Sequence, residues 1–262
     1  MNFSIHIFYL FILELGFGAC QDKLQVSKPE PDTKSPKLLI KTVSYGTDPE
    51  AVKWFEYGDN DDIIKQGISA DTVEFVYSKN KIIKRHLNKK ISWEAKTEYI
   101  TNEDGRVISS AIYDETDQEI SRFEFLYDEK GYLLRTRQKV LTTGAEYSSE
   151  FVYESGNLKE VLMYNFKGEY SSKYAFDYYA NQPNIFNLNL QQISDDIFHN
   201  ERLGKRNKNM ISQLANISKE GDTLSHIKYR YDKMEGDSVL RAFQNDVLND
   251  FNTELKYKFI KK

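Results

Sequence analysis

The chain has 262 residues, enough for one large all-β domain or two ordinary ones, and its formal net charge is -4. Hydrophobic residues make up 40% and charged residues 29%, which is typical of a globular protein rather than a disordered one. The mildly acidic charge argues against nucleic acid as a partner, because nucleic-acid binding needs a broad basic surface. Aromatic residues are frequent, with 18 Tyr and 16 Phe. Because large rings pack well on a pleated sheet, this composition favours strands.

The N-terminus has the layout of a lipoprotein secretion signal. Residues 2–19, NFSIHIFYLFILELGFGA, are largely apolar and end in Gly18 and Ala19, directly before Cys20, the only cysteine. In such signals the cysteine after the cleavage site accepts the lipid. No Lys or Arg precedes Cys20, however, and Glu14 interrupts the apolar run. We predict a signal peptide over residues 1–19 and a lipidated Cys20, with secretion without lipidation, a membrane anchor and an apolar first strand as alternatives.

Residues 20–38 are polar, show no periodicity and contain three of the five prolines. Prolines keep a chain extended, so we predict a solvated tether between the lipid and a single β-repeat domain over residues 39–262. This organisation predicts export across the inner membrane. The lipid on Cys20 would then hold the domain at the outer membrane, on its periplasmic or cell-surface side.

Pairs of residues separated by one residue recur along the domain, and both members are aromatic in every pair except one, in which Thr97 precedes Tyr99. The second residue of each pair, which we call the anchor, falls at residues 57, 77, 99, 127, 153, 178, 231 and 259. Turn residues rich in Asp, Asn and Gly follow most pairs, and an apolar stretch then resumes. The usual spacing of 20 to 28 residues fits two strands and two turns. The spacing of 53 residues between Tyr178 and Tyr231 predicts that one repeat there has lost its signature.

Within the strands the apolar period is two. In the strand predicted over residues 122–128, Phe123, Phe125 and Tyr127 fall on one face and Glu124 falls on the other. We predict that all such rings pack in a core. The fold class is therefore all-β, a long antiparallel meander of hairpin repeats that forms a curved or wound open sheet, like half of a barrel. The face opposite the rings is charged, which argues against a barrel embedded in lipid.

An insertion over residues 179–210 interrupts the repeats and is predicted to form one short helix or an irregular loop. Its basic residues could contact an anion or a sulfated or phosphorylated glycan, because a basic patch attracts anions. Asp195 and Asp196 beside His199 could perform acid–base chemistry or could cap a helix end. The basic cluster consists of Arg202, Lys205, Arg206 and Lys208.

The sequence offers no recognisable metal or cofactor site. The four histidines share no metal-binding spacing, and Cys20 is assigned to the lipid. Motifs for phosphate, dinucleotide or serine-hydrolase chemistry are absent from the sequence. We therefore predict no catalytic residue, no metal and no cofactor.

Several of these features together resemble one known family. They are Cys20 after the signal, the repeated tyrosine anchors with their Asp, Asn and Gly turns, the break formed by Asn181, Pro183 and Asn184, and the loop formed by Gly204, Lys205, Lys208 and Asn209. This combination resembles a family of uncharacterised Bacteroidota lipoproteins whose domain has a porin-like fold and repeats similar to YD repeats. The resemblance covers about residues 40–262. It implies a wound antiparallel sheet of many strands and no particular activity.

Two classes of function follow. The first is a non-catalytic binding or scaffold module of the cell envelope, held at the membrane by its lipid, with a glycan or an envelope protein as partner. The alternative is an envelope enzyme that acts on glycan with carboxylates near the 179–210 insertion. The repeats favour the module, because repeats distribute residues over a surface whereas catalysis needs them to converge.

Overall fold

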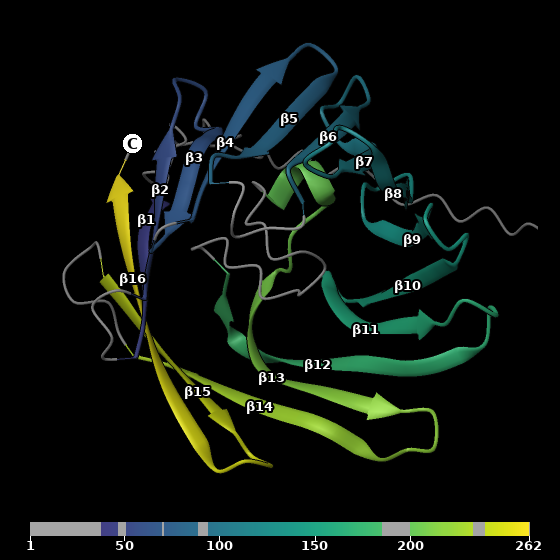
Figure 1. Ribbon diagram of the computed structural model, residues 1–262. Coiled ribbons are helices and arrows are strands. Elements are labelled where there is room, and N and C mark those ends of the chain that lie inside the picture. The colour runs from purple at the N-terminus through teal and green to yellow at the C-terminus, as the bar shows by residue number, and fades with distance from the viewer. Residues whose placement is uncertain are drawn as a thin grey trace, which may run out of the picture. The chain divides into compact units, whose positions relative to one another are not determined.

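A computed structural model describes residues 38–46, 51–69, 71–88, 94–184, 200–232 and 239–261, all of which belong to one compact unit. The described residues form a barrel of sixteen strands, each antiparallel to its neighbours (Figure 1). The predicted signal peptide, Cys20 and the tether lie outside the described residues, apart from Leu38. The elements are β1 (Leu38–Tyr45), β2 (Val52–Tyr57), β3 (Ile63–Ile68), β4 (Asp71–Ser78), β5 (Lys81–His86), β6 (Lys96–Thr101), β7 (Val107–Tyr113), β8 (Glu119–Tyr127), β9 (Leu133–Val140), β10 (Glu146–Glu154), β11 (Asn157–Tyr164), β12 (Tyr170–Pro183), η1 (Asn200–Leu203), β13 (Asn209–Ser218), β14 (Thr223–Tyr231), β15 (Val239–Asp246) and β16 (Phe251–Lys261).

The prediction of an open sheet was wrong. The first strand, β1, pairs with the last, β16, and brings buried Ile40 opposite buried Phe259. An open sheet would leave both strands with unpaired backbone edges, and closure removes these edges. For the insertion, the helical alternative was also wrong, because the described part contains a four-residue 3₁₀ turn, η1, and no α-helix. Residues 185–199 lie outside the described residues.

The long spacing between Tyr178 and Tyr231 has a different origin from the predicted one. Strand β12 pairs directly with β13, and β13 pairs with β14, so this part of the barrel contains no additional hairpin. The extra residues form a single long connection between β12 and β13. The prediction of a repeat without its signature was therefore wrong.

The meander gives the barrel two distinct ends. The turns that follow the anchors, such as residues 58–62 and 128–132, share one end with the β12–β13 insertion, and we call it the insertion end. The alternate turns, such as residues 114–118 and 141–145, lie at the opposite end, the far end. Strand β1 starts and β16 finishes at the insertion end, because both pair antiparallel with strands that run in the opposite sense.

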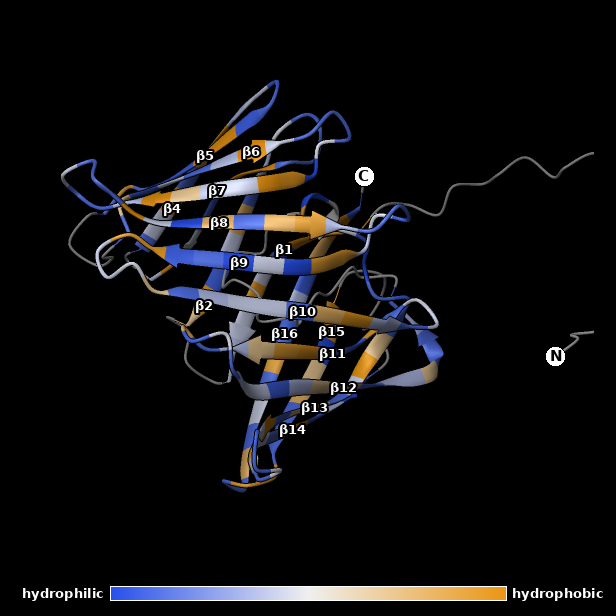
Figure 2. Cartoon of the chain, turned by 90° about the vertical axis from the view of Figure 1, so that its right-hand side faces the viewer, coloured by the Kyte–Doolittle hydropathy of each residue, from blue (hydrophilic) through white to orange (hydrophobic). Residues whose placement is uncertain are grey.

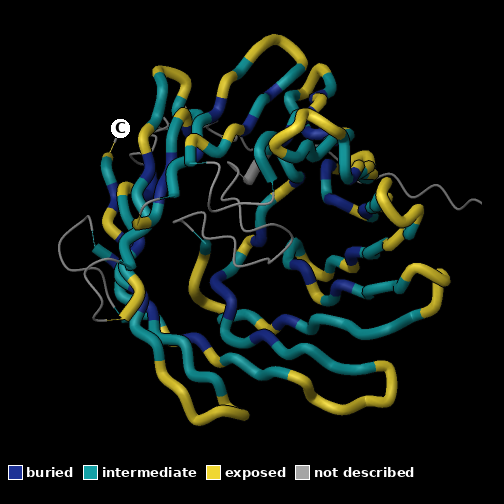
Figure 3. The backbone as a smooth tube through the Cα atoms, in the orientation of Figure 1, coloured by how far each residue is buried: buried dark blue, intermediate teal, exposed yellow. Residues whose placement is uncertain are grey.

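Side chains alternate between the inside and the outside of the barrel wall. The inward positions hold most of the buried residues, in two apolar clusters that include Val107 and Leu133. Buried positions are interspersed with less buried ones along the strands (Figure 3). The predicted common face of β8 is confirmed, because Phe123 and Phe125 stack with their ring centroids 6.3 Å apart. Tyr127 packs with Phe125 against the cluster that contains Leu133. The repeated rings thus line the inside of the barrel.

At four of the anchors, the tyrosine hydroxyl donates a hydrogen bond to a backbone carbonyl of the preceding strand. The Tyr127 hydroxyl donates to the carbonyl of Val107 at 2.6 Å, beside a β-bulge where the strand ladder is interrupted. Such a hydrogen bond provides a donor for a partly buried carbonyl oxygen, which would otherwise be left unpaired at a cost in stability. The same bond recurs from Tyr57 to Ile40 at 2.6 Å, from Tyr77 to Ile63 at 2.8 Å and from Tyr178 to Leu158 at 2.8 Å. The repeat of tyrosine therefore follows the repeat of the hairpins.

Candidate ligand-binding site

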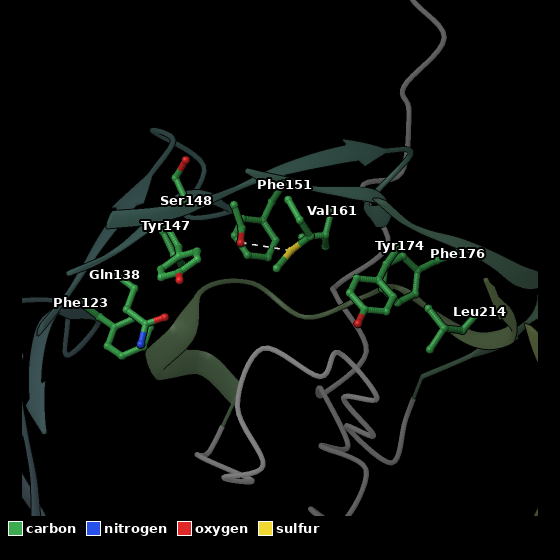
Figure 4. Close-up of a pocket in the computed structure, with 12 residues that line it drawn as sticks. Phe123, Gln138, Tyr147, Ser148, Phe151, Val161, Tyr174, Phe176 and Leu214 are labelled. Carbon is green, nitrogen blue, oxygen red and sulfur yellow. Dashed lines mark hydrogen bonds between the residues drawn. The ribbon is translucent and has the colours of Figure 1, made fainter. Parts of the chain in front are cut away.

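A pocket of about 280 Å³ lies on the inner wall of the barrel (Figure 4). Inward side chains of six neighbouring strands, β8 to β13, form it. It extends toward the far end, because Gln138 and Tyr147 lie on either side of the far-end turn at 141–145. Its lining residues are Phe123, Thr136, Gln138, Tyr147, Ser148, Ser149, Phe151, Val161, Met163, Tyr174, Phe176 and Leu214.

Strand register arranges the lining in rows across the strands. Toward the far end, Phe123 on β8 lies opposite Gln138 on β9, which in turn lies opposite Tyr147 on β10. Toward the insertion end, the buried residues Phe151 and Val161 lie opposite each other. The pocket therefore has an apolar side toward the insertion end and a mixed aromatic and polar side toward the far end.

Two polar side chains in the pocket are held in place by local hydrogen bonds. The Gln138 amide nitrogen donates to the hydroxyl of Ser121 at 3.1 Å, and Figure 4 shows the amide oxygen turned toward the pocket. The Ser149 hydroxyl donates to the sulfur of Met163 at 3.2 Å, and a thioether is a weak acceptor. A ligand oxygen could therefore replace this sulfur at little cost. Ser148 contributes to the wall, but Figure 4 shows its hydroxyl pointing away.

Among the described residues that line the pocket, none is Asp, Glu, Lys, Arg or His. Burial of an unpaired ligand charge against such a wall would be costly. The predicted catalytic alternative, with Asp195, Asp196 and His199, falls outside the described residues.

The structure places the predicted basic cluster on the insertion end. Residues 200–209, which we call the rim strap, run across successive hairpin turns of this end. The guanidinium of Arg202 contacts Asp62 at 2.8 Å and the carbonyl of Gly105 at 3.3 Å, and it lies over the ring of Tyr77 at 5.2 Å. These contacts join turns that lie far apart in the sequence, so Arg202 has a structural role at this end.

The other three basic residues do not converge with Arg202 on one point. The backbone nitrogen of Lys205 donates to Gly131 at 2.9 Å, and that of Lys208 donates to Gly156 at 3.0 Å, over two different hairpins. The side chains of Lys205 and Lys208 are exposed, whereas that of Arg206 is half-buried. An anion or glycan contact at this cluster stays a prediction, and Lys205 and Lys208 are the side chains available for it.

Sequence reasoning missed the pocket, because it assigned every aromatic residue to core packing. A signal was present in the alternation of β8 to β11. The inward positions toward the far end are polar rather than aliphatic, with Ser121, Thr136, Gln138 and Ser149 among them. Polar residues on an inward face indicate a surface that meets water or a ligand.

The rim strap also contains a glycine that tolerates no side chain. Gly204 has a φ of +102°, and an added Cβ would meet the nitrogen of Leu133 at 3.1 Å and the Tyr127 ring at 3.2 Å. We expect Gly204→Ala to lower the free energy of unfolding by about 2–3 kcal/mol, because a strained backbone and a close approach add together. Urea unfolding measures this loss.

Gly221 provides the matched control. It has a φ of +95°, but an added Cβ would meet nothing within 4 Å. Gly221→Ala should therefore cost only the backbone strain, about 1–2 kcal/mol. Equal losses in the two variants would contradict the close packing of the strap on the barrel.

Comparison with known proteins adds information on the fold. No protein-family model matches the chain, and no curated protein matches it in sequence.

The described residues contain no group of three or more His, Cys, Asp or Glu arranged to hold a metal ion. Among the same residues, no helix has the length and apolar character needed to cross a membrane.

The chain is similar in structure to a porin-like protein from Bacteroides uniformis, known from a crystal structure. The TM-score is 0.59 and the sequence identity 14%, over 85% of this chain and 96% of that chain. The TcdB2–TccC3 structure aligns over 75% of this chain and 13% of that chain at 8% identity, but its TM-score of 0.29 is too low to support an argument. The chain therefore shares a porin-like β-barrel fold with a Bacteroides protein, and this supports the fold that the Bacteroidota resemblance implied.

Proposed function

We propose that this protein is a non-catalytic binding module of the cell envelope that holds a small uncharged ligand in the pocket of its barrel. The observation that carries the proposal is the set of aromatic rings and fixed polar groups that line the pocket, with no ionic side chain among the lining residues that the structure describes. Ligand sites combine a largely apolar wall with a few placed polar groups, and this pocket has both. Its volume limits the ligand to a small molecule or one end of a larger one.

The outer wall supports an aqueous rather than a lipid-embedded barrel. A membrane barrel presents an apolar band to lipid, and a charge near the bilayer midplane costs roughly 2–4 kcal/mol. Here outward side chains of neighbouring strands carry opposite charges and form ion pairs. The cross-strand pairs are Lys81–Glu98, Arg135–Glu150, Lys139–Glu146, Lys173–Glu160 and Arg241–Glu254. Hydrophilic colour recurs along β8, β9 and β12, beside apolar stretches on β10 and β11 (Figure 2).

Attachment to the membrane is then assigned to the lipid on Cys20, as the sequence predicts, at the outer membrane. Residues 20–37 separate Cys20 from the start of β1 at Leu38. A chain of this length can span several tens of ångströms when extended, at about 3.3 Å per residue. The barrel would therefore be tethered in water beside the membrane, with its pocket accessible to molecules of the envelope.

Replacement of Cys20 tests the tether. We expect wild-type protein to be cleaved after Ala19 and to carry acyl chains, which contribute about 0.8 kcal/mol per buried CH₂ and make the attachment effectively permanent. Cys20→Ala should fold normally, because the tether separates residue 20 from the barrel, but it should lose the lipid. Membrane fractionation with intact-mass analysis measures both outcomes. A wild-type protein that is unacylated, or that retains residues 1–19, would contradict this assignment.

Ligand-dependent stabilisation tests the pocket. A ligand that binds only the folded state at 100 times its Kd stabilises the protein by about 2.7 kcal/mol, so thermal unfolding against a library of neutral and charged metabolites will reveal binders. We expect the binders to be neutral and to lose their effect with Tyr147→Ala, which removes a pocket ring that is 40% exposed. Val152→Ala is the matched control, because Val152 lies on the same strand as Tyr147, is 43% exposed and is not among the lining residues.

Two outcomes would overturn the proposal. One is a set of binders that are all charged. The other is stabilisation by neutral compounds that persists unchanged in Tyr147→Ala.

A further inference from the structure

Three side chains of the pocket form a row that has the chemistry of a sugar-binding surface. Phe123, Gln138 and Tyr147 lie opposite one another on three neighbouring strands, all on the inner face. Adjacent strands are about 4.8 Å apart, so the two aromatic residues are separated by about 10 Å with the amide between them. An aromatic face, an amide and a second aromatic face thus follow one another across the wall.

The two kinds of group in this row recognise different parts of one molecule. A flat ring offers an apolar surface, and the Gln138 amide and the Ser149 hydroxyl offer hydrogen bonds beside it. A purely apolar ligand would bury the Gln138 oxygen without a donor, which is unfavourable. An anionic ligand would find no cation among the lining residues. A neutral ring molecule with one apolar face and several hydroxyls satisfies every group.

Resting on the proposed function, we infer that the pocket binds a neutral carbohydrate of about two rings. One ring packs on Tyr147 and the next on Phe123, and Gln138 hydrogen-bonds to hydroxyls near the linkage between them. The local hydrogen bond from Gln138 to Ser121 orients the amide before binding, which limits the entropy that binding costs. The buried residues Phe151 and Val161 close the pocket toward the insertion end, so one end of the sugar chain enters from the far end.

Isothermal titration calorimetry on the purified barrel with maltose, cellobiose and N,N′-diacetylchitobiose tests this inference, with glucose 6-phosphate and 1-octanol as charged and apolar comparison ligands. We expect at least one of the disaccharides to bind, and glucose 6-phosphate to bind at least tenfold more weakly. Gln138→Leu keeps the side-chain size but removes the amide, and it should weaken disaccharide binding by at least tenfold. The same variant should leave 1-octanol binding unchanged or tighter.

The outcomes separate this inference from the function on which it rests. If 1-octanol binds through Tyr147 and no disaccharide binds, the carbohydrate assignment fails while an uncharged-ligand pocket stands. If neither class binds, both fail. Disaccharide binding that Gln138→Leu leaves intact would overturn the role of the row. The variants Phe123→Ala and Val152→Ala complete the set, with loss of sugar binding expected only in the first, and circular dichroism verifies that each variant is folded.

Discussion

Tyr127→Ala is expected to lower the free energy of unfolding by about 3–4 kcal/mol. The ring packs against the apolar cluster that contains Leu133, and its hydroxyl donates to Val107 at 2.6 Å. The hydroxyl also lies 3.4 Å from the carbonyl of Arg202 in the rim strap. Removal of a large aromatic side chain from such a site leaves a cavity and typically costs about 3–5 kcal/mol, and partial exposure of Tyr127 places it at the lower end.

Two further variants separate the contributions to this loss. Tyr127→Phe keeps the ring and removes the hydroxyl, so it should cost about 1 kcal/mol. Leu126→Ala changes the adjacent residue, which points outward and is 57% exposed, and it should cost less than about 0.5 kcal/mol. Chemical unfolding in urea measures all three. A small effect of Tyr127→Ala, comparable to that of Leu126→Ala, would contradict the inward placement of the tyrosine anchors.

Alkaline pH is expected to destabilise the barrel steeply above about pH 10. Burial raises the pKa of Tyr229 from the ordinary value of 10.0 to about 12, and it also raises the pKa values of the half-buried anchors Tyr57, Tyr127 and Tyr178. The folded state therefore holds these protons more tightly than the unfolded state. The stabilisation is complete below the unfolded pKa near 10 and is lost as the pH rises through the folded pKa.

Tyr229 alone should account for a loss of roughly 2–3 kcal/mol by pH 12, since one pKa unit corresponds to 1.36 kcal/mol. Urea unfolding at about pH 9 and about pH 11.5 measures the total, and ultraviolet absorbance of the phenolate reports the titration. Tyr229→Phe removes one titrating group, so its stability should fall less between the two pH values than that of the wild type. Equal stability of the wild-type protein at both pH values would show that the tyrosines titrate normally and are not buried.

The repeat signature was sufficient to predict the strands and the inner face. Period-two alternation in residues 122–128 placed Phe123, Phe125 and Tyr127 on one side, and the structure has them there. The reason is local, because side-chain direction in a strand alternates with each residue. Barrel closure is not local. It depends on the pairing of Ile40 with Phe259, near the two ends of the chain, and no feature of either segment alone specifies its partner.

The candidate site was harder to predict for a related reason. Phe123, Gln138 and Tyr147 come together only through the register of two strand pairs, and a shift by one residue would turn a side chain to the other face. The basic residues illustrate the opposite error. Their closeness in sequence suggested a cluster, but the partner of Arg202 is Asp62, 140 residues earlier in the chain. Basic residues that are neighbours along the rim strap therefore do not meet at one point in space.

The most direct test of the proposed ligand pocket is nuclear magnetic resonance of methyl-labelled methionine. After removal of residues 1–19, the chain would retain Met163, Met210 and Met234. Met163 lines the pocket, whereas Met210 is buried in the apolar cluster that contains Val107. On titration with a disaccharide or another neutral compound that stabilises the protein, the Met163 methyl resonance should shift with saturation while that of Met210 stays unchanged. A ligand that binds without moving the Met163 resonance would contradict binding inside the barrel.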